Sequence, residues 1–490
     1  MPAPSPPADR GTRRDGLLVP VAGLCLLVGT AAYLMVFTLL GQIGASLHVS
    51  GPLLGWTVIA TILTGTVSAA LFPALGSVLG QRRLMTAAMG CLAAGSVLSA
   101  AAPDGATLLA GRILAAPGFA ASSLSIAIVR EHRPVSSLPR SFGIIAAFAG
   151  AAAGVGFTLG GVVEEAGRGD WRSVFVAMAA VSAVTGALAA VTLPGGTLAA
   201  RRADIPGAVL LAGGLVAALL PITEGASWGW TSGRVLGLLA GAVVLLAGWA
   251  VSALRRADPL VRLNVVALPG VAGGVLLFFV TAATVGVVNL TVPSFLQAPG
   301  AAGYGAAASV LDAGLDLLPF AAAITAAGFV AGRLARRFSA RLIAVVTLGC
   351  EALALGLLAG FHHSAAEVII LLAVFGVGHG GTLAVEYVIL TRPVPPSAAG
   401  PAVGLASAAA GLSGAAASAV TTALLASRLV HAGTVTLPAA SGYEHAWLCA
   451  AAVAAAGAVA TAASPLCRAY LGRRAAMPAF QAGTAQSSLD

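Results

Sequence analysis

Long apolar runs separated by short polar segments are the dominant pattern of this sequence. Each run holds about 20 residues, enough for a helix to cross a hydrocarbon core roughly 30 Å thick. Helices are expected because lipid offers backbone amides no other hydrogen-bond partner. We predict fourteen spans, at residues 17–39, 54–76, 84–102, 106–128, 142–164, 172–193, 206–223, 234–254, 269–293, 313–332, 341–361, 366–390, 401–426 and 446–465. The pattern therefore predicts an all-α integral membrane protein.

The composition supports this interpretation and excludes a soluble protein. Charged residues make up 9% of the chain and the mean hydropathy is +0.96, whereas soluble domains contain about 25% charged residues. A formal net charge of +9 could suggest a nucleic-acid ligand. The arginines, however, fall in short clusters between apolar runs, which membrane topology explains better. We expect a lipid bilayer around the protein and no nucleic-acid partner.

The arginines divide unevenly between the two sets of loops. One set holds most of the 26 basic residues, among them Arg82, Arg130 and Arg255, and the other holds few, among them Arg172 and Arg428. Positive residues favour the cytoplasmic side of a membrane. We therefore predict a multi-pass protein of the inner (plasma) membrane with both termini in the cytoplasm, which requires an even number of spans.

Two loops resemble each other and indicate an internal repeat. Residues 73–83 follow span two and residues 332–341 follow span ten, with Leu75 corresponding to Leu334. Each loop follows the second span of a six-span unit, so we predict two related halves with two helices inserted between them. The predicted domains are a disordered cytoplasmic N-terminus (1–16), an N-terminal half (17–200), an inserted segment (201–262), a C-terminal half (263–467) and a cytoplasmic tail (468–490).

Three motifs occur in the order and spacing of a known family. They comprise Leu75, Gly80, Arg82 and Arg83 after span two, Arg112 and Gly118 in span four, and Gly156, Gly160 and Gly161 in span five. In these residues the chain resembles the major facilitator superfamily, specifically its fourteen-helix drug–proton antiporter branch. The resemblance covers nearly the whole chain and implies two six-helix halves with two inserted central helices.

The resemblance also implies a function. It implies a secondary active transporter that exports small lipophilic or amphipathic compounds, such as drugs, antibiotics and metabolites, by alternating access while protons move inward. We expect a monomer that acts on a small organic substrate, with Phe37, Phe278 and Phe279 on the cavity wall. An enzyme or a receptor is a remote alternative, because the spans carry no clustered catalytic set. No cofactor and no metal site are expected.

Charged residues inside the spans are the candidate functional residues. Arg112 lies about two turns inside span four, and an intramembrane arginine usually faces the bundle interior or a watery cavity. The family uses this arginine for coupling; structural support is the alternative. Glu386 lies in span twelve, which by the resemblance lines the cavity, and His379 is on the same helical face. They are a candidate proton relay or substrate-binding pair, or else a polar pair satisfied by neighbouring helices.

Three further acidic residues are weaker candidates. Glu351 lies near the middle of span eleven, which the resemblance places on the outside of the bundle. Asp312 and Asp316 lie near the external end of span ten, where they either attract cations or are simply hydrated.

Four positions depart from the family pattern and bear on proton coupling. Ala32 stands at the acidic position of span one, Ser77 at the loop aspartate, Ala115 at the span-four glutamine and Phe157 at the span-five proline. The usual loop network cannot form in the same way with these residues. The sequence leaves open whether Glu386 replaces the lost acidic groups, or whether the protein is an uncoupled facilitator or a nutrient importer of the same fold.

Overall fold

The computed structural model describes residues 10–48, 51–165, 170–195, 204–256, 258–261, 263, 268–432 and 435–463. Helices account for nearly all of this structure. They are α1 (Arg10–Leu47), α2 (Gly51–Leu79), α3 (Gln81–Ala100), α4 (Gly105–Ala115), η1 (Ala116–Ala120), α5 (Ala121–His132), η2 (Val135–Ser137), α6 (Leu138–Glu165), α7 (Trp171–Thr192), α8 (Ile205–Trp228), α9 (Gly233–Arg255), α11 (Pro269–Leu296), η3 (Gly300–Ala302), α12 (Val310–Asp316), α13 (Leu318–Leu334), α14 (Ala340–Leu358), α15 (Ala365–Thr391), η4 (Pro396–Ala398), α16 (Ala399–Ala426) and α17 (Ala440–Ala463).

The fourteen predicted spans are confirmed. Within the described residues, fourteen segments are helical, long enough and apolar enough to cross a bilayer. Two of them are interrupted helices. The fourth span, Gly105–His132, passes through α4, η1 and α5, and the tenth, Val310–Leu334, through α12 and α13. The pattern of apolar runs did not predict the short antiparallel hairpin of β1 (Leu429–Ala432) and β2 (Val435–Pro438), which precedes α17.

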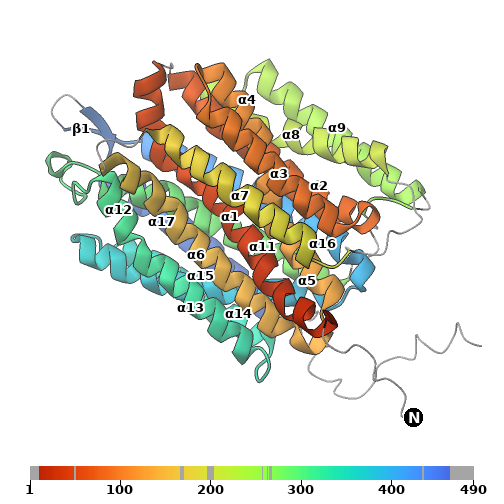
Figure 1. Cartoon of the computed structure of the whole chain (residues 1–490). Coiled ribbons are helices and arrows are strands. Elements are labelled where there is room, and N and C mark those ends of the chain that lie inside the picture. The colour runs from red at the N-terminus through yellow and green to blue at the C-terminus, as the bar shows by residue number, and fades with distance from the viewer. Residues whose placement is uncertain are drawn as a thin grey trace, which may run out of the picture.

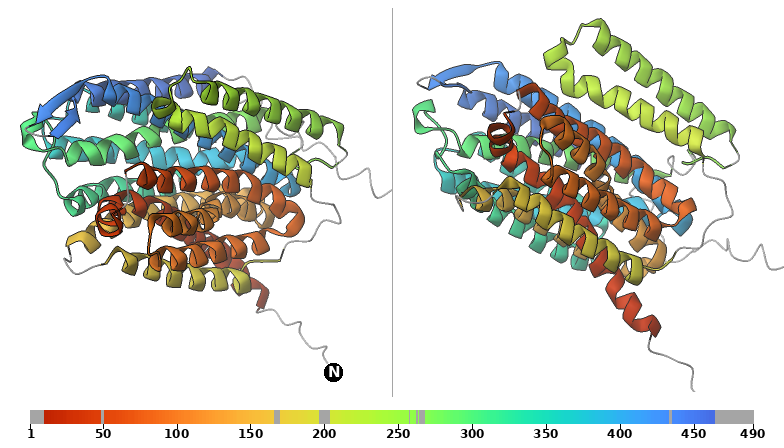
Figure 2. Two further views of the ribbon diagram at one scale, coloured as in Figure 1. Left: turned by 90° about the horizontal axis from the view of Figure 1, so that it is seen from above. Right: turned by 45° about the horizontal axis from the view of Figure 1, so that its top comes forward.

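The helices lie side by side in one bundle (Figure 1). In the N-terminal half α1 packs on α6 and α3 packs on α7; in the C-terminal half α14 packs on α15 and α17, and α11 packs on α16. The pairs α6 with α13 and α2 with α16 join the two halves. The inserted hairpin of α8 and α9 lies at the edge of the bundle (Figure 2), where α8 contacts α2 and α16.

Glycines permit the close contacts between the halves. A Cβ atom on Gly332 of α13 would lie 2.7 Å from the Cα atom of Gly143 on α6. A Cβ atom on Gly400 of α16 would overlap the carbonyl oxygen of Pro73 on α2. Small residues let membrane helices approach this closely, and the tight packing is a main source of association energy in lipid.

The N-terminus differs from the sequence prediction. Residues 1–16 were expected to be disordered, but α1 begins at Arg10. The helix continues beyond the apolar run because its backbone hydrogen bonds extend residue by residue and arginine is a good helix former. The predicted tail at 468–490 lies outside the described residues. The domain boundaries stay a prediction.

Gly400→Val should destabilise the protein, since the added side chain has no space against the α2 backbone. Overpacking of this kind costs about 1–3 kcal/mol or more. The expected result is a lower melting temperature in detergent, followed by loss of the folded peak in size-exclusion chromatography. Gly349→Val on α14 is the matched control, because a Cβ atom there meets nothing within 4 Å; equal melting temperatures for the two variants would contradict the packing argument.

Candidate functional site

A cavity of about 380 Å³ lies between the two halves and is the candidate substrate site. Its wall is mainly apolar and aromatic, with Tyr33, Phe119, Phe278, Phe320 and Tyr387 among its lining residues. Ligand pockets usually measure about 300–1,000 Å³ and are lined in this way. The cavity therefore fits one small organic molecule.

The predicted aromatic wall is partly correct. Phe278 lines the cavity as expected. Phe279 is not among the lining residues and its side chain is 44% exposed, because the next residue along a helix points about 100° away. The side chain of Phe37 lies outside the described residues.

Glu386 and His379 of α15 both line the cavity, as their spacing on one helical face predicted. Glu386 is 1% exposed. The hydroxyl group of Thr281 on α11 lies 2.9 Å from its carboxyl oxygen Oε2, and the two form a hydrogen bond. The carboxyl group of Glu386 is thus held by α11 and faces the cavity where a substrate would bind.

Glu351 lies inside the bundle, not on its outside. Leu353 and Val346 on other faces of α14 are 59% and 55% exposed, whereas Glu351 is 0% exposed. The prediction followed the position of the helix and missed the direction of this side chain, which turns inward because a carboxyl group facing lipid is costly. Gly378 of α15 makes room for it, since a Cβ atom there would lie 2.8 Å from Cγ of Glu351.

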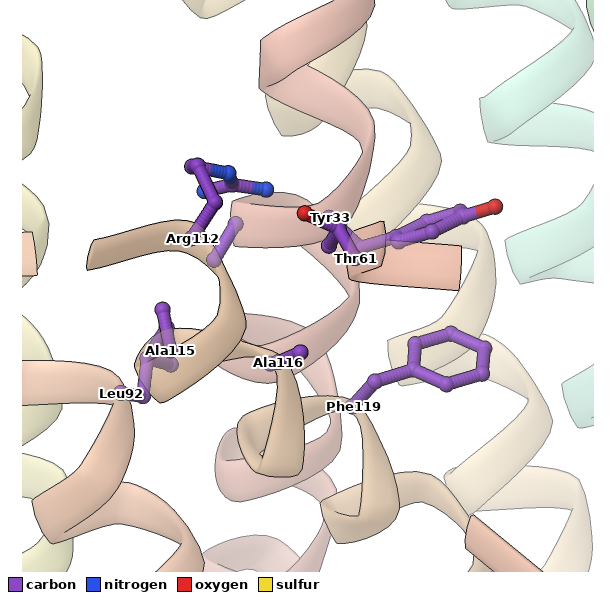
Figure 3. Close-up of a pocket in the computed structure, with 9 residues that line it drawn as sticks. Tyr33, Thr61, Leu92, Arg112, Ala115, Ala116 and Phe119 are labelled. Carbon is purple, nitrogen blue, oxygen red and sulfur yellow. The ribbon is translucent and has the colours of Figure 1, made fainter. Parts of the chain in front are cut away.

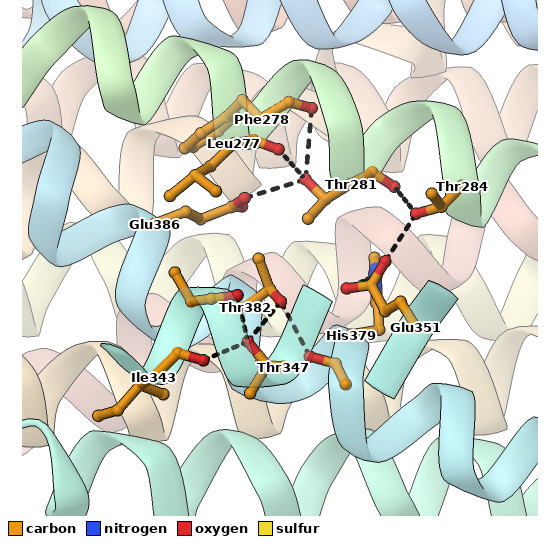
Figure 4. Close-up of polar contacts among 12 residues, drawn as sticks. Leu277, Phe278, Thr281, Thr284, Ile343, Thr347, Glu351, His379, Thr382 and Glu386 are labelled. Carbon is orange, nitrogen blue, oxygen red and sulfur yellow. Dashed lines mark hydrogen bonds and ion pairs between the residues drawn. The ribbon is translucent and has the colours of Figure 1, made fainter. Parts of the chain in front are cut away.

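A chain of polar groups connects the two buried acids (Figure 4). The hydroxyl oxygen of Thr284 lies 2.9 Å from Oε2 of Glu351 and 3.1 Å from the carbonyl oxygen of Thr281. Thr281 in turn contacts Glu386. On the other side of Glu351, its Oε1 is 3.9 Å from Nδ1 of His379. Sequence reasoning missed both threonines, although their spacing of three residues in an apolar run puts them on one face of α11.

Arg112 borders a second, much smaller cavity of about 10 Å³ (Figure 3). It is 3% exposed, and its Nε atom has no hydrogen-bond partner within the described part of the chain. Ala32, at the family's acidic position, borders the same cavity. The α-helix ends at Ala115, next to Pro117, whose ring nitrogen cannot donate a hydrogen bond. Among the described residues no carboxylate forms an ion pair with Arg112, so its charge lacks the partner that an acid at position 32 would supply.

In the loop motif after α2, Gln81 is a buried polar residue with contacts to both halves. This residue is 3% exposed, and its Nε2 donates a hydrogen bond of 3.0 Å to the carbonyl of Pro73. Its side chain packs beside Gly400 of α16, at the junction of the two halves. Gly80 has φ 95° and makes the sharp turn between α2 and α3. The sequence analysis missed Gln81, because its position beside Gly400 is set by packing between segments far apart in the chain.

The remaining motif residues lie in packing or surface positions. Leu75 packs against the cluster that includes α8, Arg83 is exposed, Arg82 approaches Gly195, Gly118 packs on Leu92, and Gly156 packs on Leu34. Gly160 and Gly161 lie in α6. Asp312 is exposed and hydrogen-bonded to Ser309 at the start of α12, and neither Asp312 nor Asp316 lines the cavity.

Arg130 connects the two halves on the face where most arginines lie. It is 5% exposed, and it donates hydrogen bonds of 2.8 Å and 2.5 Å to the carbonyl oxygens of Thr391 and Val394, just at and beyond the end of α15. The carbonyls at a helix C-terminus lack partners within the helix and carry partial negative charge. The sequence assigned Arg130 to topology alone and missed this contact.

Comparisons with known proteins agree with the architecture. No protein-family model matches the chain. The methylenomycin A resistance protein of Streptomyces coelicolor is 28% identical over 336 residues, which cover 67% of this chain and 69% of that one. The multidrug resistance protein Stp of Mycobacterium tuberculosis is 29% identical over 420 residues, or 81% and 73% of the two chains. The puromycin resistance protein pur8 of Streptomyces alboniger is 35% identical over 196 residues, or 38% and 37%.

A solved structure shares the fold. The proton:xylose symporter XylE, a major facilitator superfamily protein, superposes with a TM-score of 0.63 at 15% identity, covering 92% of this chain and 95% of that one. The chain has the fold of the major facilitator superfamily, and its sequence resembles resistance and export proteins over most of its length. Its fourteen spans fit the drug–proton antiporter branch. Its fourteen spans, this fold and the resistance-protein relatives together identify a multi-pass membrane transporter of a small molecule.

Thr284→Val should weaken the polar chain in this transporter, because the carboxyl group of Glu351 would keep its burial and lose its hydrogen-bond partner. Leaving a buried polar group unsatisfied costs about 1–3 kcal/mol, so the melting temperature in detergent should fall. Thr86→Val is the control, since that hydroxyl bonds only to a carbonyl of its own helix among the described contacts. Equal melting temperatures would show that the Thr284 contact contributes nothing.

Proposed function

We propose that this protein exports lipophilic or amphipathic organic compounds in exchange for protons, by alternating access. The observation that carries the proposal is the 380 Å³ cavity, whose apolar and aromatic wall contains a buried carboxyl group, Glu386. Aromatic surface suits an apolar substrate body, and an acidic group suits a proton or a cationic substituent. The relatives named for drug and antibiotic resistance support the outward direction.

Proton coupling is assigned to the C-terminal half. Ala32 cannot carry a proton, and within the described part of the chain the acids that border or adjoin the cavity are Glu386 on α15 and Glu351 on α14. A proton and a cationic substrate cannot both be held by Glu386, so binding of one favours release of the other. His379 and Arg112 are further candidates, His379 as a relay and Arg112 as a fixed positive charge on the opposite half.

Orientation follows from the arginines. We place the face that carries Arg82, Arg130 and Arg255 in the cytoplasm, with both termini there, in the inner (plasma) membrane. In this orientation the Arg130 contacts and the contact of Gly400 with Pro73 join the halves on the cytoplasmic side of the cavity. We further propose that the protein works as a monomer.

The moving parts are proposed to be the two predicted halves. Residues 17–200 and 263–467 would rock against each other about the cavity. The inserted segment, 201–262, would move together with α2 and α16. The glycine-lined contacts allow the helices of the two halves to meet closely where they would move against each other.

Glu386→Gln should abolish proton-driven export while leaving the fold intact, because the amide has the same shape and cannot ionise. The assay is uptake of puromycin and of ethidium, a fluorescent lipophilic cation, into inverted membrane vesicles or proteoliposomes with an imposed pH gradient. Glu367→Gln, in the first turn of α15 and outside the cavity lining, is the control. Wild-type transport that runs equally well without a pH gradient would reject the antiport and favour an uncoupled facilitator.

Arg130→Gln should open the cytoplasmic side more often, because it removes the charged contacts to the end of α15. In a variant without native cysteines, Ser122→Cys places a thiol on the cavity wall. Its labelling by a membrane-impermeant maleimide from the cytoplasmic side should accelerate several-fold when Arg130→Gln is added. Arg83→Gln, an exposed arginine on the same face, should leave the rate unchanged. If the labelling rate of Ser122→Cys is the same with and without Arg130→Gln, the proposed role of Arg130 in closing the cytoplasmic side is contradicted.

A further inference from the structure

We propose that Glu351 is a second proton-binding carboxyl group of this transporter, and that His379 passes the proton between Glu351 and the cavity. The inference rests on the proposed antiport and assigns separate positions to its protons. Glu386 meets the substrate at the cavity wall, whereas Glu351 stores a proton behind that wall. The observations that carry it are the seclusion of Glu351, its unused oxygen, and the histidine placed between it and the cavity.

Glu351 is separated from the substrate. It is 0% exposed and is not among the residues that line the cavity, whereas His379 and Glu386 are. A carboxylate sealed in an apolar bundle is costly unless it is paired or neutral. A carboxyl group that the substrate cannot reach is therefore suited to a proton and to no larger ligand.

Two buried atoms without hydrogen bonds face each other at this position. Oε1 of Glu351 and Nδ1 of His379 are both sealed from solvent and lack a hydrogen-bond partner among the described residues. They lie 3.9 Å apart, about 1 Å beyond a normal hydrogen bond. Buried polar atoms are rarely left unpaired, and a small rotation of either side chain would pair these two. Figure 4 shows the imidazole directly beside the carboxyl group.

The threonines accept either charge state of the acid. A threonine hydroxyl has one proton, yet the oxygen of Thr284 lies within hydrogen-bond distance of both Glu351 and the carbonyl of Thr281. When Glu351 is ionised, the Thr284 hydroxyl donates to the carboxylate. When Glu351 is protonated, its O–H group can donate to Thr284, which turns its own proton to the Thr281 carbonyl. The site is thus hydrogen-bonded in both states, as a group that loads and releases protons requires.

The histidine is held in a position to connect the two spaces. Its ring stacks on Phe375 one turn earlier on α15, with ring centroids 5.7 Å apart and planes 17° from parallel. Nδ1 faces Glu351, and the ring borders the cavity. The two nitrogens of an imidazole lie on different edges of the ring, so Nε2 is the atom available to cavity water.

The proton step balances without a further reactant. A proton from cavity water forms the Nε2–H bond of neutral His379 and yields the imidazolium ion. The Nδ1–H bond then breaks as the O–H bond forms on Oε1 of Glu351, leaving a neutral histidine and a neutral acid. Release into the cavity on the other side of the membrane reverses both steps, which restores the original tautomer, so one cycle needs no ring flip.

Few other ionisable groups can interfere. Among the described residues of helices packed on α14, the nearby ionisable side chains are His379 and Glu386 on α15. The ionisable groups on α17 include Glu444, which pairs with His362 near the start of that helix. α11 presents Thr281 and Thr284 to the acids. A change in charge at Glu351 would therefore be felt mainly by the histidine and by Glu386.

The test measures how many protons drive each substrate molecule. In proteoliposomes with the membrane potential clamped at zero, ethidium accumulation at equilibrium rises with the pH gradient, and the slope of its logarithm gives the number of coupled protons. Glu351→Gln should lower this slope by one, with ethidium binding retained in a thermal-shift assay. His379→Gln should lower the transport rate at least tenfold, since an amide cannot relay a proton. Glu444→Gln is the control and should match the wild type.

The outcomes separate this inference from the proposed antiport. An unchanged slope in Glu351→Gln would overturn the second proton site. A wild-type slope of zero would instead reject proton coupling itself. If Glu351→Gln does not fold, infrared difference spectra of the wild type and of Glu351→Asp replace it. Removal of the proton from Glu351 on ethidium binding should deplete a carboxylic acid band in the wild type that shifts in Glu351→Asp; if no depleted band shifts between the two proteins, the inference is also overturned.

Discussion

A polar group inside a lipid-embedded bundle has no water to bind, so it must find its partner on another helix or remain costly. This constraint determines which helix faces meet in the C-terminal half. Thr281 and Thr284 bring α11 against the acids of α15 and α14, and the hydrogen bonds of 2.9 Å at each acid hold the three helices in one relative orientation. The packing of α11, α14 and α15 therefore forms both the cavity wall and the polar chain behind it.

Close packing in turn depends on residues without side chains. Glu351 fits against α15 because Gly378 leaves its space open. Glycines also allow close contact between the halves, where Gly143 meets Gly332 and Gly400 meets Pro73. In water such glycines would weaken a helix, but in lipid the backbone contacts that they permit are favourable. The helices therefore pack closely where the two halves meet.

The charges are distributed unequally between the halves. Arg112 lies beside Ala32 in the N-terminal half, and Glu386 and Glu351 lie in the C-terminal half. Together they give the two halves opposite buried charge when the acids are ionised, and protonation of the acids removes that difference. A transporter whose halves must change their contact during each cycle can use this change in charge, since the cost of burying an ion depends on whether its surroundings remain closed.

The sequence by itself determined the membrane location, the fourteen spans and the family resemblance, because each depends on the length, hydropathy or order of local segments. It also placed Glu386 and His379 on one face, since helical periodicity is local. The tertiary structure decided which acids share a site. Glu351, Thr284 and His379 come from three helices, and the rotation of each helix about its axis depends on packing against its neighbours. For the same reason the sequence missed Gln81 and Arg130, whose partners across the halves are fixed by contacts far apart in the chain.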